Sequence, residues 1–286
     1  MPWHGHLDLR YERPAAAAAA ADQPPAATTL HHRHDGPLRI LKSLYPEGPA
    51  VCHNVIVHPP GGLVGGDQLD IRLDLAPGTH ALLTTPGATR YYRSLGDEAE
   101  QRVQARVASG ARLEWLPLET LVHSGALASS RLQFELADGA EMFGADVVAL
   151  GLPAAGEAFE RGHWRHEIRL PGRWLDRGRT AAEDLALLDG PTGWAGHRVL
   201  GSLFFATGGS LTTARSDALL EAARAVIEAH PLAARAGVSA SHEGLVLLRV
   251  LGDRVEPVFG LIAAVWQAWR PLAWGLPAIT PRVWRT

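Results

Sequence analysis

The sequence is poor in the residues that hold metal clusters, disulfides or nucleic acids. Among its 286 residues there is one cysteine, Cys52, which excludes an internal disulfide and a thiolate cluster for zinc or iron–sulfur. There is also one lysine, Lys42, and the formal net charge is −3. Because a nucleic-acid-binding protein needs a concentrated basic face, the composition predicts no nucleic-acid partner.

Long apolar runs and targeting signals are also missing. No run of about 18 uninterrupted apolar residues occurs, so we expect no membrane-spanning helix. The N-terminus lacks a basic stretch followed by an apolar one, and the alanine run at 15–21 is too short and too weakly hydrophobic for a signal peptide. These absences predict a cytoplasmic protein without a membrane partner.

The motifs of nucleotide-binding and nucleophilic enzymes are absent as well. The glycine-rich segment His58–Leu69 lacks the Gly-Lys-Ser/Thr ending of a P-loop, and its glycine spacing differs from that of a dinucleotide-binding fold. No Gly-x-Ser-x-Gly or His-Glu-x-x-His pattern occurs. We therefore expect that the chain is not an enzyme.

What the sequence does contain is alternation of apolar and polar residues, the pattern of half-buried β-strands. Turn signals such as Ser109-Gly110 and Asp138-Gly139 close these segments. Many short strands without helices between them predict a mostly β, single-domain fold. The clearest segments are 69–75, 102–107, 112–115 and 131–136, with further strands expected at 164–170, 198–207 and 244–251.

Two segments in the C-terminal third have helical periodicity instead. Ser216 is predicted to cap a helix whose apolar face begins at Leu219 and which Pro231 closes. The second helix has Pro257 in its first turn and is expected to end at Pro271.

The N-terminal part is of low complexity, with an alanine run, two prolines and the histidines His31, His32 and His34. We therefore divide the chain into a flexible segment, residues 1–37, and a β-rich domain, residues 38–286. Because imidazole suits nickel, zinc and copper, a histidine-rich metal-binding protein remains an alternative.

Four segments have unusual residue combinations. His58–Leu69 contains four glycines, and Thr84–Ser94 brings two tyrosines and two arginines together. Glu114–Thr120 contains a Trp-Leu-Pro sequence followed by Glu119. The last 18 residues, 269–286, contain three tryptophans and three prolines, so this tail must pack on the body or on a partner.

In this order and at this spacing, the four segments resemble the UreD family of urease accessory proteins, called UreH in some organisms. The chain departs from the family pattern at Leu152, where arginine is usual, at Leu118, where glutamine is common, and at Ile279, where cysteine is often found. The residues that match the family motifs are Gly61, Gly62, Gly65, Gly66, Asp67, Tyr92, Arg93, Trp115, Pro117, Arg270, Pro271, Gly275, Pro277, Pro281, Arg282 and Trp284.

The resemblance implies a mostly β, stacked-sheet, β-helix-like domain with two α-helices in the C-terminal third. It implies a chaperone-like, non-enzymatic scaffold required for nickel insertion into apo-urease. Family members bind UreF, which recruits the GTPase UreG, and a homodimer can form within the assembly. Nickel is then a transient cargo that passes from UreG through UreF and this chain to urease, and no cofactor is tightly bound.

A nickel relay needs weak, exchangeable oxygen or imidazole ligands, because tight sites trap the ion. The candidates for this path are Asp67, Glu119, Glu141, Asp146 and Glu157. For surfaces that contact partners we select Tyr91, Tyr92, Arg93, Trp269 and Trp274. A second alternative is a β-helix carbohydrate-active enzyme that uses paired carboxylates in an open groove.

Overall fold

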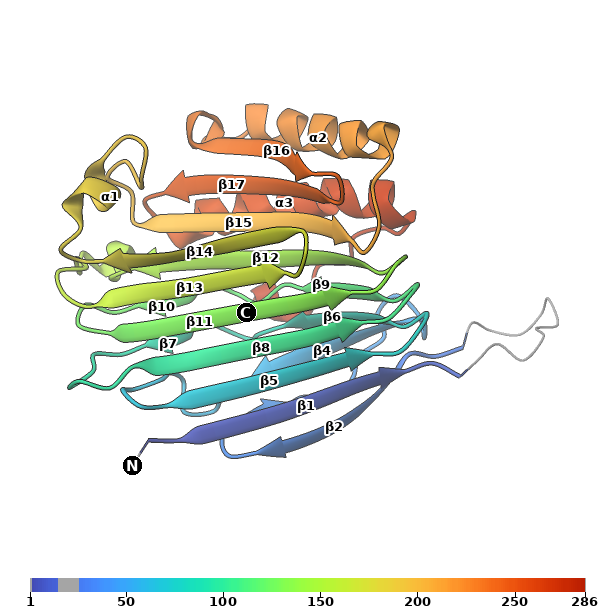
Figure 1. The fold of residues 1–286 in the computed structure, drawn as a ribbon, viewed down its shortest axis with the longest axis horizontal. Coiled ribbons are helices and arrows are strands. Elements are labelled where there is room, and N and C mark those ends of the chain that lie inside the picture. The colour runs from blue at the N-terminus through green and yellow to red at the C-terminus, as the bar shows by residue number, and fades with distance from the viewer. Residues whose placement is uncertain (1, 15–25, 286) are drawn as a thin grey trace.

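The computed structural model describes residues 2–14 and 26–285. Two β-sheets lie face to face, and two long helices cover the outer face of one of them (Figure 1). Between residues 51 and 170 the chain passes repeatedly from one sheet to the other, and equivalent strands pair in parallel. This is a solenoid-like stack of coils, so the predicted mostly β, stacked-sheet architecture is confirmed.

The first sheet has seven strands in the order β14-β13-β11-β8-β5-β1-β2 and forms the front of Figure 1. All pairs between β1 and β13 are parallel, and the two edge strands β2 and β14 pair antiparallel. The strands are β1 (His4–Glu12), β2 (Thr29–Asp35), β5 (Gln68–Leu75), β8 (Ala99–Val107), β11 (Leu127–Leu136), β13 (His163–Leu170) and β14 (Trp174–Ala181).

The second sheet contains ten strands, with the main order β16-β17-β15-β12-β9-β6-β4-β3, with β10 beside β12 and β7 beside β10. Its strands are β3 (Arg39–Ile40), β4 (Val51–Val57), β6 (His80–Thr84), β7 (Thr89–Tyr91), β9 (Arg112–Trp115), β10 (Thr120–Val122), β12 (Glu141–Leu150), β15 (Val199–Thr207), β16 (Ala236–His242) and β17 (Leu245–Gly252). Short 3₁₀ turns lie at Pro153–Ala155, Ala233–Arg235 and Arg282–Arg285.

Glycine turns form the corners of the coils. Gly110 and Gly139 both have positive φ, +70° and +77°, a conformation that a side chain disfavours. The amide of Gly110 donates to the carbonyl of Gly139, 3.2 Å away, so the corners of successive coils stack on each other. The turn signals read from the sequence thus fix where each coil changes sheet.

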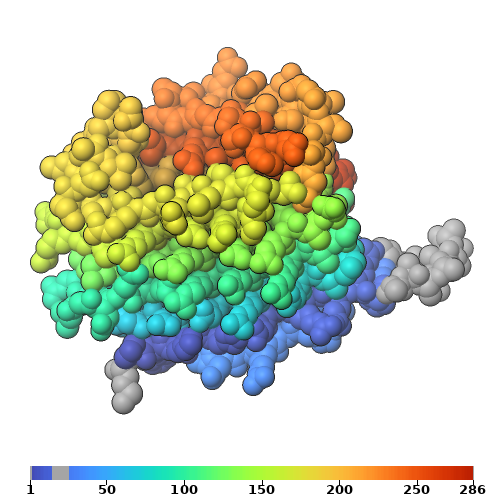
Figure 2. Space-filling model, in the orientation of Figure 1, coloured from blue at the N-terminus to red at the C-terminus, as the bar shows by residue number. Residues whose placement is uncertain are grey.

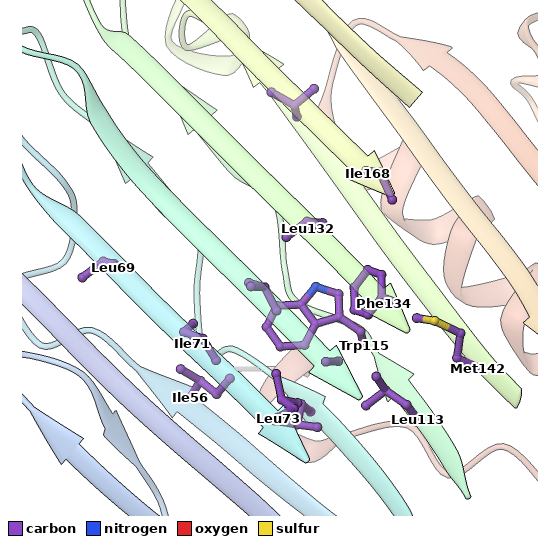
Figure 3. Packing of buried hydrophobic residues seen from close by; sticks show 14 of the residues in the cluster. Ile56, Leu69, Ile71, Leu73, Leu113, Trp115, Leu132, Phe134, Met142 and Ile168 are labelled. Atoms are coloured by element: carbon purple, nitrogen blue, oxygen red, sulfur yellow. The ribbon is translucent and has the colours of Figure 1, made fainter. Parts of the chain in front are cut away.

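The two sheets and the helices form three layers, and a hydrophobic core lies between each pair of adjacent layers. The first lies between the sheets, where Trp115, Phe134 and Ile71 pack with the aliphatic side chains around them (Figure 3). The second lies between the second sheet and the helices and includes Phe143 and Trp269. Strands of the second sheet are therefore buried on both faces, whereas the first sheet has one face in water.

The helices are α1 (Leu185–Asp189), α2 (Thr213–Glu228) and α3 (Val255–Trp274). The two predicted helices are present, but their ends differ. α2 begins earlier, because Thr212 rather than Ser216 caps it by accepting a hydrogen bond from the amide of Arg215. α3 continues past Pro271 to Trp274, because a proline in the last turn removes only one helical hydrogen bond. The short helix α1 was not predicted. None of the helices among the described residues is long and apolar enough to cross a membrane.

The N-terminal part does not match its prediction. β1 pairs with β5 and β2, and Leu7, Leu9 and Tyr11 are at most 2% exposed. The predicted flexible segment over residues 1–37 is therefore wrong for residues 4–12 and 29–35, and a boundary at residue 38 would cut through the first sheet. The alternating apolar residues of β1 supply the physical reason, since they complete the core between the sheets. Residues 15–25 of that prediction lie outside the described residues.

Candidate functional site

A buried cluster of charged residues joins the second sheet to α3. Glu114 lies on β9, where its neighbours Leu113 and Trp115 face the core between the sheets. Because side chains alternate along a strand, Glu114 points the other way, toward Arg270 of α3. Both Glu114 and Arg270 are 0% exposed. Ions buried so completely need partners for nearly all their polar atoms.

Each polar atom of this pair has a partner. Arg270 donates from Nε to the two carboxylate oxygens of Glu114, at 3.1 and 3.2 Å, and from Nη1 to Glu47, at 2.6 Å. The indole of Trp266 donates to Glu114 Oε2 at 2.8 Å. Nε2 of His80 lies 2.8 Å from Glu114 Oε1. We call Glu47, His80, Glu114 and Arg270 the core ion cluster.

The core ion cluster holds its carboxylates in the charged form. Burial raises the pKa of Glu114, but hydrogen bonds and charge from His80 and Arg270 outweigh it, so this pKa lies below its ordinary value. Burial likewise opposes ionisation of Glu47, and His53 and Arg270 again lower the pKa. Burial lowers the pKa of His80 against the pull of Glu114. The cluster therefore holds Arg270 between two ionised carboxylates, with His80 hydrogen-bonded to one of them, and it joins α3 to the second sheet.

The C-terminal tail is fastened by the same cluster. Arg270 also donates to the carbonyl of Pro277, and the amide of Gly275 closes α3 on the carbonyl of Pro271 at 2.8 Å. The indole of Trp284 donates to Thr84 Oγ1 at 2.8 Å. The sequence left open whether the tail packs on the body or on a partner, and in this structure it packs on the body.

The glycine-rich loop is built around Asp67. Its Oδ1 accepts the amide of Trp3 at 2.7 Å, and its Oδ2 accepts the amide of Val64 at 2.9 Å. Gly62 has no room for a side chain, because a Cβ there would overlap the Tyr92 ring and lie 2.9 Å from the carbonyl of Arg90. Asp67 is 5% exposed. Asp67 thus ties the loop to the residue that precedes β1 and closes the loop on its own backbone.

The residues selected as partner contacts divide into two groups. Tyr91 and Trp269 are at most 1% exposed, and Trp274 is 8% exposed, so these side chains lie in the cores and offer a partner no surface. Tyrosine and tryptophan side chains are largely apolar and are often buried. The packing of α3 on the second sheet buries both tryptophans. Tyr92 is half-buried and Arg93 is exposed, so these two retain the capacity for a contact.

A polar seam interrupts the core between the sheets near β14. We define it by Asp146 of β12, His166 of β13, Asp176 of β14, Ser202 of β15 and Arg249 of β17. Nε2 of His166 lies 3.4 Å from Asp176 Oδ1, and Arg249 donates to Asp176 Oδ2 at 2.5 Å. Asp146 lies opposite Ser202 in the strand register, and among the described residues nothing hydrogen-bonds to its carboxylate. Asp146 is half-buried, so its carboxylate is accessible to water or to a ligand.

The environment of Asp146 shifts its protonation. Burial, opposed by the charge of His166 and assisted by the neighbouring Asp176, raises the pKa of Asp146 to about 6. Asp176 differs, because hydrogen bonds from His166 and the charge of Arg249 outweigh burial and lower its pKa. The seam therefore holds one fixed carboxylate and one that exchanges a proton near neutral pH.

The other predicted carboxylates lie elsewhere. Glu141 at the start of β12 pairs with Arg215 and accepts the Trp274 indole at 2.6 Å. Glu119 is half-buried beside β10, and Glu157 is exposed in a turn. Asp67 lies in the glycine-rich loop. The structure therefore brings no two of the five predicted residues into one site.

Metal ligands are also spread out. Across residues 2–14 and 26–285, no group of three or more His, Cys, Asp or Glu side chains is arranged to hold a metal ion. His31, His32 and His34 lie on the edge strand β2, with His31 near Glu12 at 3.5 Å and His34 beside Arg39 at 3.2 Å.

Comparison with known proteins decides the family. The model of the family described as UreD urease accessory protein matches residues 4–285. The chain belongs to the UreD urease accessory protein family. A urease accessory protein UreD of Leptothrix cholodnii is 56% identical over 286 residues, with 100% of both chains covered. Those of Variovorax paradoxus and Polaromonas naphthalenivorans are 54% and 51% identical, covering 100% and 99% of both chains.

The residues that carry the UreD resemblance have clear structural tasks in this chain. The glycines and Asp67 shape the loop that receives Tyr92, and Arg270 to Trp284 fasten the tail. Trp115 lies in the core between the sheets, with its indole nitrogen unpaired among the described atoms. The family match begins at residue 4 and therefore includes β1, in agreement with its place in the first sheet.

Sequence reasoning missed the core ion cluster and most of the polar seam. The alternation of Glu114 with Leu113 and Trp115 assigns it to the polar face of a strand, and the pattern is the same whether that face meets water or α3. His166 and Asp176 were not selected. A sequence signal for His166 does exist. In β13 it shares a face with the core residues Trp164 and Ile168, so it must face inward although it is polar.

Proposed function

We propose that this chain is a non-enzymatic, cytoplasmic metallochaperone scaffold required for nickel insertion into apo-urease. It acts in a complex with UreF and, through UreF, with the GTPase UreG. Membership of the UreD urease accessory protein family over residues 4–285 is the observation that carries the proposal. The named relatives, which match this chain from end to end, support it.

The finer proposal concerns the route of the ion. We place it in the polar seam, where Asp146 lies between the sheets with its carboxylate free of hydrogen bonds from described residues. Nickel accepts carboxylate oxygen and imidazole nitrogen, and the seam offers Asp146 together with His166. The nearby Asp176 adds negative charge that favours a divalent cation.

A relay ligand must release what it binds. Two features of Asp146 support weak, exchangeable binding: a proton competes with the metal near neutral pH, and His166 is already within reach of Asp176 at 3.4 Å. Nickel is then a transient cargo with no tightly bound cofactor. Glu119 and Glu157, which are partly or fully exposed, remain proposed contacts toward the ends of such a route. Asp67 and Glu141 have a structural role in this proposal, because backbone amides, Arg215 and Trp274 already occupy their carboxylates.

The assembly partners are UreF, UreG and apo-urease, and a homodimer within the assembly remains part of the proposal. Tyr92 and Arg93 are the proposed partner contacts that retain exposed area. An assembly of this kind needs interfaces larger than about 1,000 Å².

The test is co-expression of this chain with UreF, UreG and the urease subunits from the same source, in medium containing nickel. Urease activity and the nickel content of purified urease are measured with and without the chain. The proposal expects the chain to co-purify with UreF and urease, and expects nickel-dependent activity to disappear without it. Equal activity without the chain would refute it.

The carbohydrate-active enzyme is the alternative that this experiment separates. Such an enzyme needs two carboxylates about 5–10 Å apart in an open groove, and it acts without a partner. Asp146 and Asp176 are the nearest pair of acids in the seam, but Asp176 is engaged by Arg249 and His166. Hydrolysis of polysaccharides by the isolated chain would favour the alternative.

A further inference from the structure

The outer face of the first sheet has an uneven charge distribution. Along β1, β5 and β8 opposite charges lie beside each other in the strand register, as in Asp8 with Arg72 and Asp70 with Arg102. Such cross-strand pairs neutralise each other and stabilise a sheet. This half of the face, in blue and cyan at the lower part of Figure 2, is therefore balanced in charge.

The half formed by β11, β13 and β14 is different. Its exposed side chains include five arginines but few carboxylates, chiefly Glu135 and the half-buried Glu167. We call the five arginines the arginine surface: Arg131, Arg165, Arg169, Arg177 and Arg179. It lies over the green and yellow strands in Figure 2. The chain as a whole has a net charge of −3, so this surface contrasts with the rest of the molecule.

Like charges lie directly opposite each other on this surface. Arg165 of β13 pairs in register with Arg179 of β14, and Arg131 of β11 pairs with Arg102 of β8. Directly opposed like charges destabilise a sheet. Arg169 and Arg177 have no ion-pair partner among the described residues. Arg131, Arg165 and Arg179 do have ion-pair partners, which are Glu100, Glu98 and Glu183. The exposed arginines still outnumber the exposed carboxylates on these three strands, so the surface keeps an excess of positive charge.

The shape of the surface suits a ligand. Arg131, Arg165, Arg177 and Arg179 line a shallow hollow of about 510 Å³ together with Ser129 and Glu167. The hollow rests on hydrogen-bonded strands, so its arginines project from a rigid base. A guanidinium binds carboxylates through two parallel hydrogen bonds, and arginine is enriched in protein interfaces.

We propose that the arginine surface docks an acidic segment of a protein partner. A protein fits better than a nucleic acid, because the exposed residues of the three strands include no aromatic side chain for base stacking. Under the proposed function the partner is a component of the urease assembly. That identification rests on the proposed function, whereas recognition of an acidic segment does not.

The experiment measures binding of a fluorescent polyglutamate peptide to the full-length chain by anisotropy, at low and high salt. The variant Arg177→Glu with Arg179→Glu is compared with wild type and with Arg224→Glu, a matched reversal on the exposed face of α2. Arg179→Glu places a carboxylate opposite Arg165, whereas Arg177→Glu places one opposite Glu167. The gain and the loss oppose each other, so the melting temperature of the double variant is expected to stay near the wild-type value and is measured beside the binding.

The expected result is at least tenfold weaker peptide binding by the double variant, wild-type binding by Arg224→Glu, and a wild-type affinity that falls as salt rises. Equal binding by wild type and the double variant would overturn the inference, and so would tighter binding of duplex DNA than of the peptide. Co-purification of the same three chains with UreF and urease then tests the partner. If the wild-type chain does not co-purify with UreF and urease, the proposed function is contradicted. The inference about the arginine surface is decided separately, by the peptide binding.

Discussion

Arg270 and Glu114 lie 156 positions apart in the sequence and meet in the core, where the Nη2 of Arg270 is 3.0 Å from Oε1 of Glu114. Neither side chain has any exposed surface. Glu47 is a second carboxylate bound to the same guanidinium, with Nη1 to Oε2 at 2.6 Å. The pair joins the third-layer helix α3 to the stacked strands and sets where the C-terminal tail begins.

Removing one partner of this pair should destabilise the fold strongly. Arg270→Met leaves Glu114 and Glu47 buried without their countercharge, at a cost of about 3–5 kcal/mol. Urea denaturation of the purified chain measures the change. Arg282→Met is the matched control, because Arg282 is exposed in the same tail, and it should change stability by less than about 0.5 kcal/mol. A double variant, Arg270→Met with Glu114→Gln, should recover part of the loss, and equal stability of the two arginine variants would contradict this account.

Acid should unfold the chain through the same cluster. The pKa values of Glu114 and Glu47 are held below their ordinary value of 4.5, so these carboxylates contribute stability that is present above the unfolded pKa and lost as pH falls through the folded pKa. We expect the melting temperature to fall steadily below about pH 4.5. In Glu114→Gln the dependence on pH should be shallower. An identical slope for wild type and variant would argue against the cluster as the acid-sensitive element.

The close approach of the glycine loop to Tyr92 gives a second stability prediction. Gly62→Ala puts a methyl group into the Tyr92 ring and should cost about 1–3 kcal/mol. Gly87→Ala provides the control, because an added Cβ there meets nothing within 4 Å and its φ is ordinary. That control should leave the unfolding midpoint unchanged or slightly raised. Equal effects of the two substitutions would show that the loop adapts to a side chain.

β1 should be essential to the fold, contrary to the prediction of a flexible segment over residues 1–37. Leu9→Ala removes a side chain that is 2% exposed and should cost about 2–5 kcal/mol. Arg10→Ala, at the next position with a 72% exposed side chain, should cost less than about 1 kcal/mol. Deletion of residues 1–36 is expected to yield insoluble protein. A soluble deletion variant with a wild-type melting temperature would show that β1 is dispensable.

The repeated coils could be predicted from the sequence because each depends on local signals. Alternation over residues 69–75 and 131–136 fixes the buried face, and Ser109-Gly110 and Asp138-Gly139 fix the corners. The ends of α2 and α3 were misplaced, since Thr212 and Ser216 are equally suitable caps by residue type.

The candidate site was less predictable, because it depends on which strands become neighbours. Asp146 was selected from the sequence, but its neighbours His166 and Asp176 come from the other sheet. Asp67 was selected as a metal ligand, although its oxygens accept two backbone amides whose positions depend on the folded loop. Trp269 and Trp274 were selected as contact residues because nothing local distinguishes a buried tryptophan from an exposed one.

The ionised carboxylate of Asp146 should lower the free energy of unfolding at neutral pH. Its pKa of about 6 exceeds the ordinary 3.8, so the folded state holds the proton more tightly, and stability falls as pH rises through about 6. Asp146→Asn removes this penalty and should stabilise the fold by about 1–3 kcal/mol at pH 7. At about pH 4 the variant and wild type should be alike. Destabilisation by the substitution would show that the carboxylate serves the fold.

The most direct test of the central claim is the nickel content of urease purified after co-expression with UreF, UreG and either wild-type chain or Asp146→Asn. If nickel passes through the polar seam, urease matured with the variant should contain at least severalfold less nickel, although the variant is the more stable chain and still co-purifies. Asp217→Asn, at an exposed position of α2, should give wild-type nickel content. Full nickel loading with Asp146→Asn would contradict the route proposed here.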